Sequence, residues 1–278
     1  MNKKVKKKNP LKLKACVVAL SLWGFSAVLA LSSSPVMAAD TASNTAQEQV
    51  AIALANKGVD LGSLHRYEEA LAVDNEVITR FGNSQDTTIQ EVVAMALFSK
   101  GVDLSELHRY EEALAAYNDL ITRFGNSQDT KIQEQVAGAL FNKGLALDEL
   151  HRYEEAIASY NDVITRFGNS QDKIIQEQVA SALNNKGFDL ENLHRYKEAL
   201  AVNNNLITRF GNSQDTKIQE QVAGALFNKG GDLYNLHRIG QARAEWEELV
   251  YRFKDNPDVK IQKDVATARH NLLVTRNF

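Results

Sequence analysis

Residues 133–175 read QEQVAGALFNKGLALDELHRYEEAIASYNDVITRFGNSQDKII, and the same pattern recurs along most of the chain. A glutamine returns at a fixed interval of 43 residues, at Gln47, Gln90, Gln133, Gln176, Gln219 and Gln262. The same interval separates His65, His108, His151, His194 and His237. Five units follow, at residues 47–89, 90–132, 133–175, 176–218 and 219–261. A repeat of this length predicts an array of stacked units, each packed on its neighbours.

Each unit carries the pattern of two helices. In the third unit Val136, Leu140 and Leu147 lie at the spacing of one helical face, which predicts a first helix. His151-Arg152 marks a turn, and the acidic pair Glu154-Glu155 opens a second helix at its positive dipole end. Gly168-Asn169 is typical of a helix C-cap. Ser170-Gln171-Asp172 predicts the N-cap of the next unit's first helix.

The unit resembles the tetratricopeptide repeat. The matching residues of the third unit are Leu140, Lys143, Gly144, Leu147, Arg152, Tyr153, Ala156 and Tyr160. The resemblance implies an all-α fold, a right-handed superhelical solenoid of helix-turn-helix repeats. Two features depart from the family: the period is 43 rather than 34 residues, and a lysine replaces the usual apolar residue before the glycine. Armadillo and HEAT repeats share the length but lack this register.

The ends of the chain differ from the repeats. Seven lysines lie in the first 14 residues, and the uncharged apolar run 15–31 and small residues at 36–39 follow them. This order predicts a signal peptide over residues 1–38, then a short linker at 39–46. The chain would then be exported across a bacterial cytoplasmic membrane to the periplasm or beyond, or stay membrane-anchored if the signal is not cleaved. Residues 262–278 are expected to form a C-terminal capping helix.

Composition and charge exclude several classes of function. The net charge is −3, but residues 1–38 hold seven lysines and no acid, so the remainder has 25 basic against 35 acidic side chains, or −10. A domain this acidic repels phosphate backbones, and we expect no nucleic-acid binding. The single cysteine, Cys16, lies in the signal segment, so the exported domain would have neither disulfides nor thiol chemistry.

Comparison of the five copies points to one face of the first helices. Five positions at offsets i, i+3, i+7, i+10 and i+11 change in almost every copy, while their neighbours hardly vary. The tetratricopeptide resemblance implies that this face lines a concave groove for peptide segments of partner proteins. The expected groove residues are Phe98, Val102, Glu106, Phe141, Leu145, Asp148, Glu149, Asn184, Phe188, Glu191, Phe227 and Tyr234. Drift on an idle, solvent-facing stripe is the alternative interpretation.

A correlated change links two positions of the unit. Asp74 and Asn203 replace the aromatic residue that the second helix carries in the other units. The same two units also lack the phenylalanine of the first helix and have Ala55 and Asn184 there. The joint loss predicts that the two positions touch within a unit.

The sequence offers no catalytic, cofactor or metal site. Equivalent histidines of stacked units lie about 10 Å or more apart, too far to share a zinc ion that each nitrogen must approach to about 2.1 Å. The pairs Lys57/Asp60, Lys100/Asp103, Lys186/Asp189 and Lys229/Asp232 are expected to be ion pairs on a solvated helix face. No nucleotide-binding or hydrolase motif occurs.

These observations predict a non-catalytic, exported interaction module that binds a protein or peptide, with no cofactor, no metal and no nucleic-acid partner. Two alternatives stay open. The array could be a structural spacer without a groove ligand, or a helper subunit of an envelope enzyme complex.

Overall fold

The computed structural model describes the backbone of residues 35–276 and the side chains of residues 45–276, and every regular element in this range is an α-helix. The helices are α1 (Pro35–Ser63), α2 (Tyr67–Phe81), α3 (Thr87–Glu106), α4 (Tyr110–Phe124), α5 (Thr130–Glu149), α6 (Tyr153–Phe167), α7 (Lys173–Asn192), α8 (Tyr196–Phe210), α9 (Thr216–Asn235), α10 (Ile239–Phe253) and α11 (Val259–Val274). The all-helical repeat fold expected from the sequence is confirmed.

Each repeat supplies one long first helix, with an odd number, and one shorter second helix, with an even number. The predicted signal peptide falls almost wholly outside the described residues. Because α1 begins at Pro35, the segment 39–46, expected to be a linker, is helical. α11 begins at Val259, three residues before the expected start of the capping helix, because Asp258 caps it there.

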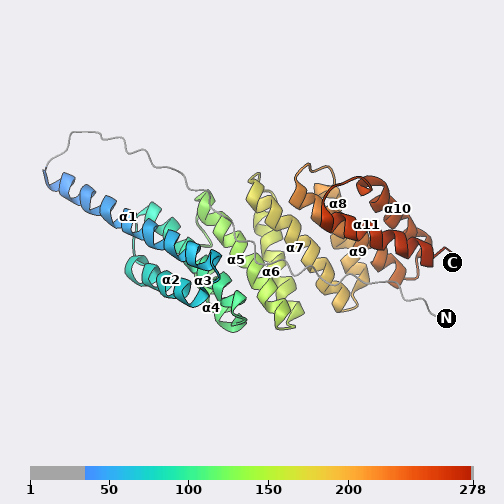
Figure 1. Cartoon of the computed structure of the whole chain (residues 1–278), viewed down its shortest axis with the longest axis horizontal. Coiled ribbons are helices and arrows are strands. Elements are labelled where there is room, and N and C mark those ends of the chain that lie inside the picture. The colour runs from blue at the N-terminus through green and yellow to red at the C-terminus, as the bar shows by residue number, and fades with distance from the viewer. Residues whose placement is uncertain (1–34, 277–278) are drawn as a thin grey trace. The chain divides into compact units, whose positions relative to one another are not determined.

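The described chain forms two compact parts, an N-terminal part that ends at Asn142 and a C-terminal part that begins at Lys143. In the N-terminal part α2 packs between α1 and α3, and α3 also packs on α1 and α4. In the C-terminal part each helix from α6 to α11 packs on the next, and the first helices also contact each other, α7 on α9 and α9 on α11 (Figure 1). Each part is therefore a stack in which first helices form one layer and second helices another.

Aspartates start the first helices, as the sequence predicts. The side chain of Asp172 accepts a hydrogen bond from the Ile175 amide at 2.9 Å, and Asp215 accepts from Ile218 at 3.1 Å. Asp86 and Asp258 make the same bond. Such a bond satisfies one of the amides that a helix N-terminus leaves without an intrahelical partner.

The histidines make the turn between the helices of a unit. All five have a left-handed backbone, with φ between 57° and 60°. In the first unit the His65 amide donates to the Gly62 carbonyl and the Arg66 amide donates to the Leu61 carbonyl, each at 2.9 Å. This is the Schellman arrangement that ends a helix. The sequence thus identified the turn but not that the histidine takes the conformation that usually belongs to glycine.

The glycines after the second helices have a different role from the one expected. Gly168 has φ −54°, in the right-handed region, so it is not the left-handed cap that Gly-Asn suggests. Its carbonyl instead accepts a hydrogen bond from Arg209 of the next second helix, and Gly211 accepts one from Arg252 in the same way. After α10, the last second helix, Lys254 replaces this glycine. The glycine leaves room for the arginine of the following unit.

A second set of glycines lets an aromatic ring reach the first helix. A Cβ on Gly101 would lie 2.2 Å from the ring of Tyr117, and one on Gly230 would lie 2.2 Å from Trp246. Tyr117, Tyr160 and Trp246 are fully buried. The core of each of these units is therefore built around one aromatic ring seated on a glycine.

Candidate partner-binding face

The aromatic residues expected in the groove are core residues. Phe98 is 6% exposed, Phe141 3% and Phe227 4%, and Val102 is buried as well. The predicted ladder of exposed phenylalanines is therefore wrong. Phe98 lies three residues before Gly101, and its side chain turns toward the second helix of its own unit.

The contacts of these rings explain their burial. The ring of Phe98 lies 6.4 Å from that of Tyr117 on α4, measured between centroids. In the last unit the indole nitrogen of Trp246 donates to the Phe227 carbonyl at 3.2 Å. The prediction that the two aromatic positions touch within a unit is confirmed for Phe98 and Tyr117. Units that lack both rings fill the space with smaller side chains, Ala55 with Asp74 and Asn184 with Asn203.

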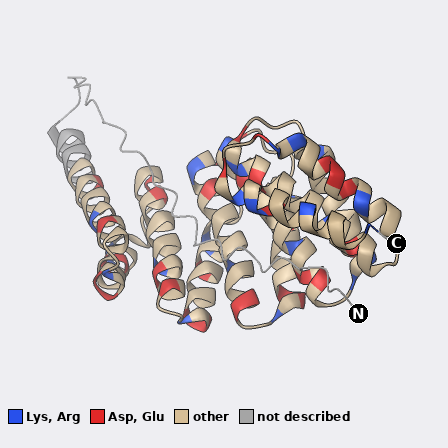
Figure 2. Cartoon of the chain, turned by 45° about the vertical axis from the view of Figure 1, so that its right-hand side comes forward, with Lys and Arg blue, Asp and Glu red and all other residues tan. Residues whose placement is uncertain are grey.

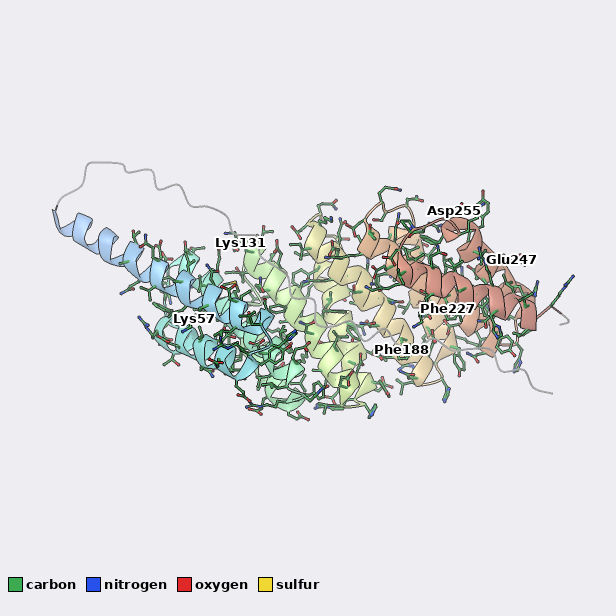
Figure 3. All side chains as sticks on the ribbon, in the orientation of Figure 1. Lys57, Lys131, Phe188, Phe227, Glu247 and Asp255 are labelled. Carbon is green, nitrogen blue, oxygen red and sulfur yellow. The ribbon has the colours of Figure 1, made fainter. Side chains whose placement is uncertain are left out.

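Four positions farther along the first helix, apolar side chains are partly open to solvent. In the C-terminal part Leu145 and Phe188 are half-buried, and Gly231 holds the equivalent position on α9. A Cβ on Gly231 would meet no atom within 4 Å, so the surface beside it is open. Figure 3 labels Phe188 and, nearby on the next first helix, the buried Phe227. Phe188 and Gly231 hold the same repeat position on α7 and α9, and these two helices pack on each other.

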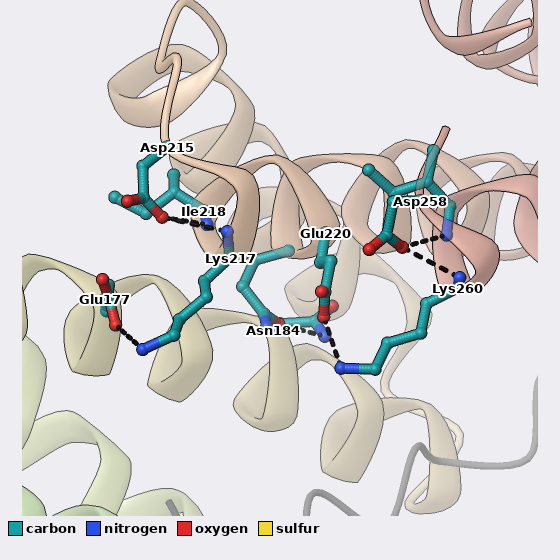
Figure 4. A network of polar contacts seen from close by, with 10 residues as sticks. Glu177, Asn184, Asp215, Lys217, Ile218, Glu220, Asp258 and Lys260 are labelled. Carbon is teal, nitrogen blue, oxygen red and sulfur yellow. Dashed lines mark hydrogen bonds and ion pairs between the residues drawn. The ribbon is translucent and has the colours of Figure 1, made fainter. Parts of the chain in front are cut away.

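Several polar residues of the predicted face are engaged inside the protein. Asp148 accepts a hydrogen bond from the Tyr160 hydroxyl at 2.6 Å, and Asn184 donates to Gln221 at 3.0 Å (Figure 4). Glu106 accepts from the Tyr67 hydroxyl at 3.4 Å. Tyr234 packs its ring 6.4 Å from Trp246 and is half-buried. Glu191 is also half-buried, whereas Glu149 is exposed.

Ion pairs join successive first helices beside this face. Lys217 pairs with Glu177 at 2.7 Å and Lys260 pairs with Glu220 at 2.8 Å (Figure 4), and Lys131 pairs with Glu91 in the N-terminal part. Each of these lysines is about half exposed or more. Such pairs contribute about 0.2–1 kcal/mol each, so they fix the register of stacking more than its strength.

None of the four expected lysine–aspartate pairs is found among the ion pairs of the described residues. Lys100 donates instead to Asn75 at 2.7 Å, Lys186 donates to Asn161 at 2.6 Å, and Lys229 pairs with Glu245 at 2.8 Å. All three lysines thus bind a second helix. Their expected partners Asp103, Asp189 and Asp232 are buried. These aspartates are enclosed by neighbouring helices, and the lysines bind other polar residues, on second helices.

The buried aspartates are the main polar feature that the sequence reading missed. Burial, reinforced by the nearby Asp103, raises the pKa of Asp74 to about 8, and burial raises the pKa of Asp232 to about 8. Asp103 sits between Val102 and Leu104, which are both buried. An acidic residue between two apolar residues of a helix is the sequence feature that could have predicted this burial.

The described residues show no built site for chemistry. Among residues 45–276 no group of three His, Cys, Asp or Glu side chains could hold a metal ion. Two hollows of about 270 and 290 Å³ lie at the loops that begin with Gly211 and Gly168. Both are lined by loop Asn, Ser and Gln residues and by the arginine that binds the glycine carbonyl.

Acidic and basic residues are interspersed along the helices (Figure 2). None of the described helices combines the length and apolar character needed to cross a bilayer.

Comparison with known proteins gave one family match and several similar solved structures. Residues 138–170 match the family model described as tetratricopeptide repeat, which confirms the resemblance seen in the third unit. Similar solved structures include an engineered protein, with 18% identity, 82% of this chain and 91% of that chain covered, and a TM-score of 0.49. A tetratricopeptide repeat protein from Parabacteroides merdae has 13% identity, 82% and 93% coverage, and a TM-score of 0.47. No curated protein sequence matches the chain.

Proposed function

We propose that this tetratricopeptide repeat protein is a non-catalytic interaction module that binds a protein segment on the first helices of its C-terminal part. The observation that supports this most is that one repeat position of three first helices is accessible, with Leu145 and Phe188 partly exposed and open space at Gly231. Apolar side chains left open on adjoining helices favour contact with another chain. Among the repeat positions that vary from copy to copy, these remain accessible once the phenylalanines are placed in the core.

The partner surface is therefore smaller than the sequence indicates. Phe98, Phe141 and Phe227 maintain the fold, and a partner would contact Phe188, Leu145 and the exposed carboxylate of Glu149. An apolar side chain of the partner would pack on Phe188. The carboxylate of Glu149 favours a basic residue of the partner next to this apolar side chain.

The test compares two aromatic residues of the C-terminal part. Phe188→Ala removes the half-buried ring on the proposed face, and Tyr251→Ala removes a ring of α10 that is 76% exposed and lies outside the face. Each variant is first checked for helical circular dichroism and cooperative unfolding. The proposal expects partners captured by the parent protein to be retained by Tyr251→Ala and lost by Phe188→Ala. Retention by both variants would contradict the proposed face.

A structural spacer is the second candidate, because the burial of the phenylalanines removes most of the expected groove. The ion pairs that repeat between successive first helices would suit a spacer equally well. The Phe188→Ala substitution separates the two functions. A spacer keeps its activity in cells when Phe188→Ala is folded, whereas an interaction module loses it.

We also propose that the chain is exported and that residues 1–38 are removed. The lysine cluster followed by an uncharged apolar run supports this proposal. Mass spectrometry of the protein recovered from the cell envelope would then give a chain that starts at Ala39. An intact N-terminus on a membrane-bound product would instead indicate an uncleaved anchor.

A further inference from the structure

Buried aspartates recur at the junctions between units. Asp103, Asp189 and Asp232 hold one repeat position on the first helices and are at most 5% exposed. The equivalent residue of the first unit, Asp60, is exposed, and among the described residues no second helix precedes α1. The burial of this position is thus a consequence of stacking a unit on the one before it.

The partner of this aspartate comes from the second helix of the preceding unit. Asn203 of α8 donates to Asp232 of α9 through Nδ2 at 3.0 Å. Asp74 of α2 and Asp103 of α3 are the residues equivalent to this pair three units earlier. The first junction therefore has two carboxyl groups where the last has an amide and a carboxyl.

Few charges face the first junction. The charges that act on the Asp74 carboxyl group are those of Asp103 and Lys100, both on α3. Asp74 also lies against Gly58 of α1. Asp103 is near Glu106 on its own helix, the Tyr67 hydroxyl on α2, the Tyr117 hydroxyl on α4 and Gly62 on α1. Within the described residues Oδ2 of Asp74 has no hydrogen-bond partner. Two like charges cannot both be maintained here without water.

The middle junction, inside the C-terminal part, also brings two carboxyl groups together, but both come from first helices, and Tyr160 holds the second-helix position of Asp74 and Asn203. Asp189 of α7 lies within hydrogen-bonding reach of Asp148 of α5, which also accepts from Tyr160 of α6. Glu149 is the further charge near Asp148. Burial, and then the Asp148 carboxylate, raise the pKa of Asp189, so one proton is shared by the pair. At the last junction Asn203 is the polar group that faces Asp232, and Oδ1 of Asp232 has no partner among the described residues.

We propose that these buried carboxyl groups make the stacking of successive units depend on pH, so that the junctions are closed while the aspartates are protonated and loosen when they ionise. A protonated Asp189 can donate a hydrogen bond to the Asp148 carboxylate, and a protonated Asp103 adds no second charge beside Asp74. Ionisation adds a buried negative charge to each junction, which is costly away from water.

The sign of the pH dependence follows from the difference in proton binding between the folded and unfolded states. An unfolded aspartate ionises near pH 4, whereas burial raises the pKa of Asp103 to about 7 and that of Asp74 to about 8. The folded state binds more protons than the unfolded state between these values. The contribution of these two aspartates to stability is therefore greatest below about pH 4 and falls as the pH rises, until it levels off above about pH 8.

The test measures urea unfolding of the purified protein at several values between about pH 5 and about pH 9. We compare the parent with Asp74→Asn, which reproduces the Asn203–Asp232 pair, and with Asp189→Asn. The matched control is Asp60→Asn, the same repeat position without burial. Because each variant changes one side chain only, the contributions of all other groups cancel in the comparison.

We expect the urea midpoint of the parent and of Asp60→Asn to fall equally with rising pH. Asp74→Asn and Asp189→Asn should have higher midpoints than the parent near pH 8, and together they should remove about half of the fall or more. Hydrogen exchange of α3 amides should quicken with pH beyond its intrinsic rate in the parent but not in Asp74→Asn. An equal pH dependence in all four proteins would overturn the proposal, as would α3 exchange that follows the intrinsic rate alone.

Discussion

Two neighbouring glycines of α9 experience opposite surroundings. Gly230 faces the second helix of its unit, where Trp246 leaves no room for a side chain, and Gly231 faces open space. The difference comes from the rotation of about 100° between successive helical residues. Gly230 is therefore needed for the packing of its unit. Gly231 makes no such contribution and only destabilises the helix, because glycine loses more backbone entropy on folding than other residues.

This contrast predicts opposite effects of the same substitution. Gly230→Ala pushes a methyl group against the indole and should lower the free energy of unfolding by about 1–3 kcal/mol. Gly231→Ala fills open space and should raise it by about 0.5–1 kcal/mol. Denaturant unfolding of the two variants measures both. A loss of stability in Gly231→Ala would show that the first-helix face at this point is covered rather than open.

At the scale of the helix, the turn between the two helices of a unit depends on a left-handed histidine. In the third unit His151 Nδ1 and the Tyr153 hydroxyl are hydrogen-bonded at 3.0 Å, and three other units make the same contact. Ile239 replaces the tyrosine in the fifth unit, so His237 lacks this bond. The left-handed backbone costs a residue with a Cβ about 1–2 kcal/mol, and glycine has no such penalty.

His237→Gly should therefore stabilise the protein by about 1 kcal/mol. His151→Gly should gain less, because it also loses the contact with Tyr153. Thermal or urea unfolding of the two variants provides the comparison. If His237→Gly proved less stable than its parent, the side chain would have a packing role that its exposed position does not indicate.

The helices illustrate what could be predicted from sequence. Helix order, the aspartate caps and the histidine turn depend on residues close in the chain, and the repeat displayed each of them several times. The burial of Phe98 and Phe227 could not be predicted in this way, because it depends on the angle at which a second helix docks on its glycine. The inward aspartates were missed for the same reason, since their position looks solvated until the preceding unit is stacked on it.

At the scale of the whole molecule, the array is modular. Leu120–Gly144 and Leu206–Gly230 are identical over 25 residues at twice the period. Deletion of residues 121–206 therefore joins the chain within identical sequence and removes two whole units. Tyr117 would then precede Asp232, and a tyrosine already precedes an aspartate in this way at Tyr160 and Asp189.

This deletion should give a folded, helical protein that unfolds cooperatively at a lower denaturant concentration, because fewer stacked interfaces remain. Deletion of residues 121–185 is the control, since it joins a second helix to the middle of a first helix and breaks the order of the units. Circular dichroism and urea unfolding distinguish the two. Loss of structure in the in-register deletion would mean that stability depends on contacts beyond neighbouring units.

The central claim is that the half-buried Phe188 marks the surface where another protein binds. A photo-crosslinking amino acid placed at position 188, and in a separate protein at the exposed position 251, tests this in living cells. We expect a discrete crosslinked product from position 188 and none from position 251. Equal labelling at the two positions, or none at position 188 in a folded protein, would contradict the claim and favour the spacer.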